Sequence, residues 1–329
     1  MKRIFNFIVI AGLASQALVV GQGSDANKVL SMVREALGGD KKLASVKTIT
    51  ATGTSTRVNG ETSSAPTDYE LAMELPDKFV KKEVIATIGS NAIGRTTGFN
   101  GDGLISETDT PPAFGGQVLM RFGPGGPAIG ATPTPEQAEA MRKAALASAH
   151  EEFARFTLGM FATSFPAFPL EFSYAGQAAS PDGNADVIGI TGADDFAAKL
   201  FVDGATHLPL MLSWMAKEPL VLKNTNTPGR GGASGSGPAV VQFGGGGQSL
   251  TPEQRDQMVK DMQDQMKEAD ATRRIVEYRV YYGDYQDVSG IKLPFKIQRS
   301  IDGKASEELT LEKIKVNPRI DPKKFEVTK

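Results

Sequence analysis

The feature that most constrains the fold is a repeated alternation of apolar and polar residues, broken at short intervals by turn dipeptides. The alternation begins at Val46 and runs to Val58, where Asn59-Gly60 is typical of a tight hairpin turn. Similar segments follow along most of the chain and are separated by turn signals such as Asp302-Gly303. The sequence therefore predicts a meander of antiparallel strands, which we expect over residues 46–58, 69–75, 78–88, 95–99, 104–108, 172–175, 185–191, 197–202, 208–217, 272–285, 291–300 and 304–316.

Composition limits the kinds of protein that this meander can form. With 40% hydrophobic and 22% charged residues among 329, the chain can bury a core. A net charge of -2 provides no broad attraction for nucleic acid, so none is expected as a partner. The chain has no cysteine, which excludes disulfides, iron–sulfur sites, thiol nucleophiles and a lipid anchor on a modified cysteine.

The N-terminus has the pattern of a secretory signal peptide. Lys2 and Arg3 precede an apolar run from Ile4 to Leu13, and small residues follow. Ser15-Gln16-Ala17 and Gly21-Gln22-Gly23 both fit a cleavage site, so we place the signal peptide in residues 1–23 with the cut between positions 17 and 23. An uncleaved anchor is the alternative, but the run is shorter than the roughly 20 residues that span a bilayer. We expect an exported protein of the periplasm.

Three helices are expected beside the strands. Apolar residues at helical spacing predict an N-terminal helix from Asp25 to Leu37. Two further helices each follow a glycine-rich insertion, near residues 115–133 and 228–250. Both open with the same four residues, Thr-Pro-Glu-Gln, at 134–137 and 251–254, which is a strong helix start signal. We expect one half-barrel domain over residues 24–329, and the alternative is two domains divided in the second glycine-rich segment.

Apolar stripes on the two inserted helices are the candidate ligand-binding residues. These stripes either pack on the sheet as ordinary core or form a soft lid over an apolar cavity. The strand at 208–217 is apolar on both alternating faces, so both sides of it need cover. The residues expected to bind a ligand are Phe153, Phe156, Met160, Trp214, Met258 and Met262.

The search for catalytic chemistry finds no motif. A G-x-S-x-G elbow and phosphate-binding glycine loops are absent. His150 and His207 are the only histidines and lack the spacing of a metal site. The adjacent carboxylates at 151–152, 194–195 and 307–308 are interpreted as solvated faces. No catalytic residue, metal ligand or cofactor is therefore expected, and a hydrolase would need a Ser or Asp beside one of the histidines.

Several turn motifs resemble those of the outer-membrane lipoprotein-sorting (Lol carrier-like) proteins. Asp203-Gly204-Ala205-Thr206-His207-Leu208-Pro209 is similar to their D-x-x-T-x-L-P hairpin, and Phe99-Asn100-Gly101-Asp102-Gly103 to their F-x-G-x turn. The segment from Tyr285 to Phe295 and the end at Ile320-Asp321-Pro322 are also similar. The resemblance implies a mainly β fold, a curved antiparallel half-barrel with helices that close its concave face over acyl chains. The glycine-rich insertions are not part of the family's pattern.

We therefore expect a non-enzymatic carrier or sensor of lipid or lipidated protein. The alternative is an envelope scaffold that binds a protein partner and no small ligand. The partners expected are a lipid or an acylated protein, an envelope protein, and the membrane through peripheral contact.

Overall fold

The computed structural model describes residues 23–60, 62–88, 91–109, 119–121, 134–180, 183–219, 240–242 and 267–327, together with Glu253, Gln257, Lys260 and Asp264. The expected signal peptide and its cleavage site lie outside these residues, apart from Gly23. No helix in the described part of the chain is long and apolar enough to cross a membrane.

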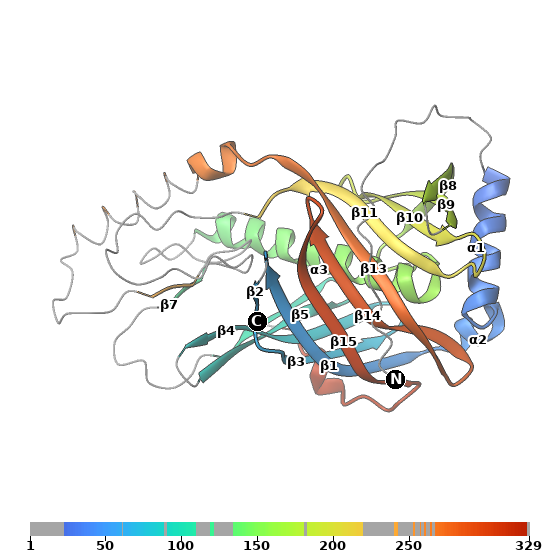
Figure 1. Ribbon diagram of the computed structural model, residues 1–329. Helices are drawn as coiled ribbons and strands as arrows, with labels where there is room; N and C mark the ends of the chain where they lie inside the picture. Colours follow the sequence, from blue (N-terminus) through green and yellow to red (C-terminus); the bar gives the residue numbers. More distant parts are fainter. Residues whose placement is uncertain are drawn as a thin grey trace.

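The fold is mainly β and consists of one large antiparallel sheet of 13 strands, curved into an open trough (Figure 1). The order across the sheet is β6-β5-β4-β3-β1-β15-β14-β13-β11-β10-β9-β8, and β2 pairs with β1. The bounds are β1 Thr48–Asn59, β2 Thr62–Ser63, β3 Thr67–Glu74, β4 Lys78–Ile88, β5 Asn91–Asn100, β6 Gly103–Thr108, β8 Leu170–Ser180, β9 Gly183–Gly192, β10 Ala197–Asp203, β11 Pro209–Lys217, β13 Ile275–Val288, β14 Ile291–Ile301 and β15 Lys304–Val316.

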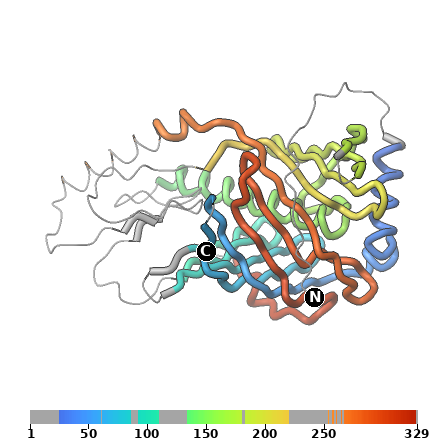
Figure 2. Tube along the Cα trace, in the orientation of Figure 1, coloured from blue at the N-terminus to red at the C-terminus, as the bar shows by residue number. Residues whose placement is uncertain are grey.

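The two halves of the sheet join where the first strand pairs with the last. Figure 2 shows the blue N-terminal strand beside the red C-terminal strands. β1 and β15 are antiparallel, from Ile49 opposite Val316 to Arg57 opposite Glu307. The other pairs of adjacent strands in the sheet are consecutive or nearly consecutive along the chain. The meander predicted from the alternation is therefore confirmed.

Turn chemistry explains why the strands end where they do. In the β10–β11 turn, Asp203 accepts hydrogen bonds from the backbone amides of Ala205 and Thr206 and from the Thr206 hydroxyl. This side chain holds the D-x-x-T loop in place. In the β5–β6 turn, Gly101 has a φ of 55°, a left-handed conformation that glycine adopts without strain.

The central helix α3, Pro135–Phe161, runs through the hollow of the trough (Figure 1). Its start is the predicted capping box, in which the Thr134 and Gln137 side chains each accept a hydrogen bond from the other's backbone amide. The second half of the helix, from Ala149 to Phe161, is largely buried and contributes Phe153, Phe156 and Met160 to the main core. The second half of the helix is thus packed in the core, and the first half is largely exposed.

Two shorter helices close one end of the trough. α1, Gly23–Leu37, contacts β8 and β14, and it buries Leu30, Val33 and Leu37 in the main core. α2, Asp40–Ser45, follows directly and was not predicted. Its positioning contact is a hydrogen bond from Lys42 Nζ to the carbonyl of Gly290, 248 positions away.

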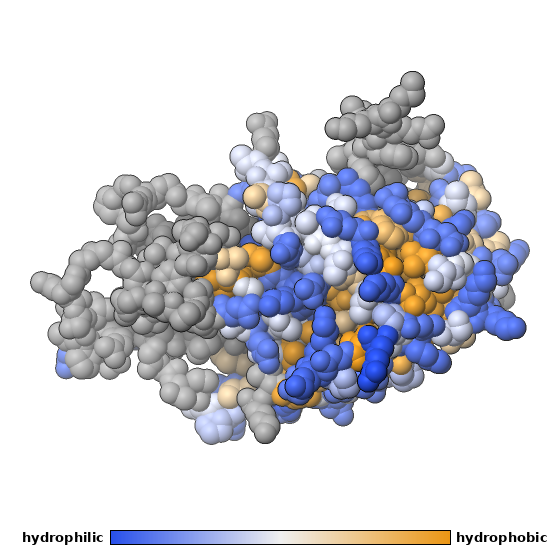
Figure 3. Space-filling model, turned by 90° about the horizontal axis from the view of Figure 1, so that it is seen from below, coloured by the Kyte–Doolittle hydropathy of each residue, from blue (hydrophilic) through white to orange (hydrophobic). Residues whose placement is uncertain are grey.

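The C-terminal segment covers a small part of the sheet, at β3, β4, β5 and β6. The short helix η1, Pro322–Phe325, buries Phe325 against Ala72, Val80 and Ile105. Asn100 donates a hydrogen bond to the Phe325 carbonyl and fixes it there. Seen from below, the molecule is mostly hydrophilic and hydrophobic residues show in several separate places (Figure 3).

The strand β11 departs from the expectation that both of its faces are covered. Leu212 and Met211 are buried on opposite faces, as expected. Leu210 and Met215 are exposed, by 39% and 62%. A bulge opposite Val202 leaves Leu210 as the unpaired residue, and the pairing with β10 ends at Ser213. Both faces of β11 are therefore buried only in the middle of the strand.

The inserted segments carry a pairing that the sequence did not predict. β7, Leu119–Arg121, and β12, Val240–Gln242, form a two-stranded antiparallel sheet, so the two glycine-rich insertions are joined. The described residues between 253 and 271 are helical, in agreement with the second expected helix. Most of its start signal at 251–254 and the rest of both insertions lie outside the described residues.

Candidate functional site

A cavity of about 350 Å³ lies between α3 and the inner face of the sheet. Its wall comes from α3 and from strands β1, β4, β5, β11, β13, β14 and β15. Pockets that hold small molecules in proteins have volumes of about 300–1,000 Å³, so this cavity is at the lower end of that range.

The wall of the cavity carries both apolar and charged side chains, which we call its apolar part and its charged part. The apolar part is formed by Phe156, Trp214, Val280, Ile297 and Ile301. The charged part contains three carboxylates and six cationic groups. They are Glu83, Glu152, Glu307, Arg57, Lys81, Arg95, Arg155, Arg279 and Arg299. A wall of this kind can contact both the apolar and the charged groups of one molecule.

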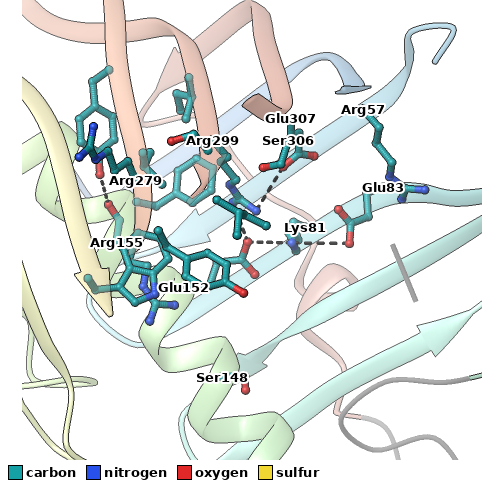
Figure 4. Close-up of a pocket in the computed structure, with 18 of the residues that line it drawn as sticks. Arg57, Lys81, Glu83, Ser148, Glu152, Arg155, Arg279, Arg299, Ser306 and Glu307 are labelled. Carbon is teal, nitrogen blue, oxygen red and sulfur yellow. Dashed lines mark hydrogen bonds and ion pairs between the residues drawn. The ribbon is translucent and has the colours of Figure 1, made fainter. Parts of the chain in front are cut away.

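Glu152 of α3 is the centre of the charged part. Its Oε1 lies 2.7 Å from Lys81 Nζ on β4 and 3.0 Å from an Arg299 terminal nitrogen on β14. Figure 4 shows these side chains pointing toward one another from the helix and from two walls of the trough. β4 and β14 are separated in the sheet by β3, β1 and β15, so one carboxylate ties the helix to both walls.

The other two carboxylates extend this network along the strands. Glu83 accepts from Arg95 at 2.8 Å and lies 3.6 Å from Lys81. Glu307 accepts from the Ser55 hydroxyl at 2.7 Å and lies 3.3 Å from Arg299. These pairs compensate buried charges that would otherwise destabilise the fold.

Arg57 differs from the other strand cations. Its guanidinium donates to the carbonyls of Ile85 and Val84, at 2.7 and 3.1 Å. No carboxylate pairs with it in the described part of the chain. Its charge is therefore available to an anion in the cavity.

The charges set the protonation states of the buried carboxylates. Burial alone would raise the pKa of Glu152, but the charges of Lys81 and Arg299 and their hydrogen bonds outweigh it and lower the pKa to about 2. Burial also acts to raise the pKa of Glu83, and Lys81 and Arg95 lower it below its ordinary value. Both groups are therefore ionised at neutral pH, and neither is poised to exchange a proton.

Several buried polar atoms near the cavity have no hydrogen-bond partner among the described residues. They are the Tyr69 and Ser300 hydroxyls and the Nε atoms of Arg95 and Arg155. Tyr69 and Ser300 are only 4% and 6% exposed. Buried donors are normally satisfied, so these atoms are donors that a ligand or water can use.

An aromatic stack forms the side of the cavity at β11. Trp214 and Tyr278 stack with ring centroids 5.5 Å apart. The Arg155 guanidinium lies 4.3 Å from the Trp214 ring centre and is paired with Glu151 at 2.6 Å. Trp214 is the only tryptophan of the chain, so its fluorescence reports on this wall.

The residues expected to bind a ligand fall into three groups. Phe156 and Trp214 line the cavity. Phe153 and Met160 are fully buried in the core, where Phe153 contacts the rings of Phe79, Phe99 and Phe165. Met258 and Met262 lie outside the described residues.

The charged network was missed by the sequence analysis. The interpretation of the adjacent carboxylates as solvated faces is wrong for Glu152 and Glu307, whose side chains are only 19% and 20% exposed. A usable signal was present on β4, because Phe79, Lys81 and Glu83 share one face and Phe79 is core. Charges at the inward positions of a strand indicate a polar cavity.

Each of the two histidines has an aspartate nearby, His150 near Asp102 and Asp194 and His207 near Asp203. His150 packs on the Phe99 ring at 4.2 Å, and burial lowers its pKa although Asp102 and Asp194 act to raise it. Among the described residues, no Ser or Asp side chain is hydrogen-bonded to either imidazole. The residues that the structure describes also contain no cluster of three or more His, Asp or Glu suited to a metal ion.

Comparisons with known proteins find similar structures at low sequence identity. No protein-family model and no curated protein matches the chain. A LolA superfamily protein from Nitrosomonas europaea is 9% identical, with 92% of this chain and 97% of that chain covered and a TM-score of 0.44. A putative outer membrane lipoprotein-sorting protein domain from Vibrio parahaemolyticus is 10% identical, with coverage of 91% and 96% and a TM-score of 0.42.

A third similar structure is a DUF1329 family protein from Desulfovibrio piger, 5% identical, with coverage of 92% and 97% and a TM-score of 0.42. These three similarities concern the fold alone.

Proposed function

We propose that this protein is a non-enzymatic carrier or sensor in the cell envelope that binds an amphiphilic molecule in the cavity beneath α3. The observation that supports the proposal is that the wall of one cavity carries aromatic and aliphatic side chains together with charged ones. The apolar part of the ligand would lie against Phe156, Trp214 and Ile297. Its polar end would lie among Lys81, Arg57 and the neighbouring charges.

The ion pairs around Glu152 hold α3 against the sheet, and a ligand that enters beneath the helix has to loosen them. α3 is tied to the sheet by Lys81 and Arg299 through Glu152. It is also tied by the Tyr282 hydroxyl, which donates to the Arg155 carbonyl at 2.7 Å. The apolar inner face of the sheet lies beneath the same helix. A shift of α3 would enlarge the cavity along this face, which offers room for a longer apolar chain.

The fluorescence of Trp214 tests this proposal. We expect a neutral amphiphile, dodecyl maltoside below its micellar concentration, to change the emission of Trp214 with saturation. Ile301→Glu, which places a charge on the apolar wall, should weaken this binding at least tenfold. The matched control is Ile275→Glu on β13, because Ile275 is 58% exposed and does not line the cavity. Equal binding by both variants would contradict the proposal.

The alternative function is an envelope scaffold without a small ligand. Met215 and Ile275 favour it, because both are more than half exposed and lie on the paired strands β11 and β13. Large exposed apolar side chains that lie close together are a feature of protein-binding surfaces. A scaffold would show no saturable change of Trp214 emission with any amphiphile.

A further inference from the structure

The carboxylate of Glu152 occupies the place where an anion of a ligand would bind. It is the only carboxylate that α3 contributes to the described lining of the cavity. It lies between a lysine and an arginine that belong to opposite walls, 2.7 and 3.0 Å away. Two converging cationic donors of this kind are a frequent arrangement for binding carboxylate or phosphate oxygens.

The lining of the cavity carries more positive than negative charge. Arg155 and Arg279 are paired with Glu151 and Glu277, which lie outside the cavity lining. The remaining lining cations are Arg57, Lys81, Arg95 and Arg299. Lys81, Arg95 and Arg299 share the three lining carboxylates, and Arg57 pairs with none of them among the described residues. The Arg57 guanidinium makes hydrogen bonds only to backbone carbonyls among the described residues. The cluster can therefore accept a further negative charge.

Buried hydroxyl groups provide an independent indication of a ligand. Ser300 lines the cavity, is more than nine-tenths buried, and its hydroxyl has no partner among the described residues. The Tyr69 hydroxyl is equally buried and unpartnered in the described part of the chain, and it lies close enough to Glu152 and Arg299 to feel their charges. Hydroxyl groups can donate hydrogen bonds to an oxyanion.

We propose that the cavity binds the phosphate group of an amphiphile, which takes the place of the Glu152 carboxylate between Lys81 and Arg299. This inference rests on the proposed function and names the class of its ligand. The displaced Glu152 no longer ties α3 to β4 and β14, so binding of the phosphate loosens the helix. Glu152 thus holds the empty protein closed and competes with the ligand.

A phosphate is favoured over a carboxylate because the ligand must displace a carboxylate already in place. A ligand carboxylate has the same charge and the same two oxygens as Glu152. Replacing Glu152 by it would therefore give no stronger interaction with Lys81 and Arg299. A phosphate monoester has about 1.5–2 negative charges at neutral pH and three acceptor oxygens. It can therefore reach Arg57 or a buried hydroxyl as well as Lys81 and Arg299. A ligand can shift α3 only if it binds more tightly to the state in which the helix is released than to the state in which Glu152 holds it.

Titration of Trp214 fluorescence with three probes tests the inference. The probes are dodecyl phosphate, dodecyl maltoside and inorganic phosphate, each with the full mature chain. We expect dodecyl phosphate to bind at least tenfold tighter than either of the others. Glu152→Gln should bind dodecyl phosphate at least tenfold tighter than the parent, because the internal competitor is lost. Hydrogen exchange of residues 149–161 should become faster when dodecyl phosphate binds to the parent.

Two further variants keep the test decisive. Arg57→Met removes a cation without breaking any described ion pair, and it should weaken binding of dodecyl phosphate about tenfold while binding of dodecyl maltoside stays unchanged. Arg142→Met on the exposed half of α3 is the matched control and should change neither. If Glu152→Gln does not fold, Arg57→Met carries the test alone.

The outcomes separate this inference from the proposed function. Equal affinity for dodecyl phosphate and dodecyl maltoside, unchanged in Glu152→Gln and Arg57→Met, would overturn the phosphate site and leave the amphiphile carrier standing. Inorganic phosphate that binds as tightly as dodecyl phosphate would support the phosphate site and contradict an amphiphilic ligand. No response to any probe would overturn both.

Discussion

Replacing Glu152 by glutamine should make the fold both less stable and less sensitive to acid. The substitution keeps the shape of the side chain and removes the charge that faces Lys81 and Arg299. Breaking a buried ion pair on one side costs about 3–5 kcal/mol. Glu83 and Glu307 remain near the two cations, at 3.6 and 3.3 Å, so we expect a loss of about 3 kcal/mol in the free energy of unfolding at neutral pH.

The pKa of Glu152 gives a similar magnitude by a separate route. Lys81 and Arg299 hold the pKa at about 2 in the fold, against an ordinary value of 4.5. A difference of this size corresponds to about 3 kcal/mol. Because the pKa is lower in the folded state, the carboxylate stabilises the fold above about pH 4.5. This stabilisation is lost as the pH falls from 4.5 toward 2.

Urea unfolding of the parent and of Glu152→Gln, followed by Trp214 fluorescence, measures the effect at two pH values. The difference in unfolding free energy should be about 3 kcal/mol at pH 7 and about 1 kcal/mol at pH 3. Glu139→Gln is the matched control, since Glu139 pairs with Arg142 on the exposed half of α3 and should contribute less than about 0.5 kcal/mol. A difference that stays the same at both pH values would refute the role of Glu152 as an ionised tie.

Three further substitutions test the packing around α3, each by thermal or urea unfolding. Gly159→Ala should cost about 1–3 kcal/mol, because a Cβ there would overlap the Tyr282 ring; a stability equal to the parent's would show that the ring can move aside. Phe153→Ala should cost about 3–5 kcal/mol, since it empties a site among three rings, and a loss below about 1 kcal/mol would contradict its place in the core. Tyr282→Phe should cost about 1 kcal/mol through the lost hydrogen bond to the Arg155 carbonyl, and no loss would mean that water replaces it.

Most of the sheet could be predicted from the sequence, because alternation and turn chemistry are local signals. β4 and β15 begin and end where they were expected, and α3 begins at its predicted capping box. α2 and η1 were missed because each is shorter than two helical turns and is held by distant contacts. Lys42 reaches Gly290, and Phe325 packs under Val80.

The site could be predicted only in part. Phe156 and Trp214 lie on apolar stripes that the sequence displays, and both line the cavity. The charged part joins Glu152, Lys81 and Arg299, which are up to 218 positions apart in the numbering and meet only because β1 pairs with β15. No local spacing signals that contact. The inward position of Lys81 and Glu83 beside Phe79 was the available indication. It predicts a polar cavity but does not identify the ligand.

The most direct test of the account is the chemical identity of whatever the protein holds when it is isolated from cells. The protein would be purified from the envelope fraction without detergent, extracted with organic solvent, and the extract analysed by mass spectrometry. The account predicts one class of amphiphile that carries a phosphate group, in near-stoichiometric amount, and its depletion in Ile301→Glu but not in Ile275→Glu. An extract without any amphiphile, from a protein whose Trp214 also fails to respond to dodecyl phosphate, would contradict it.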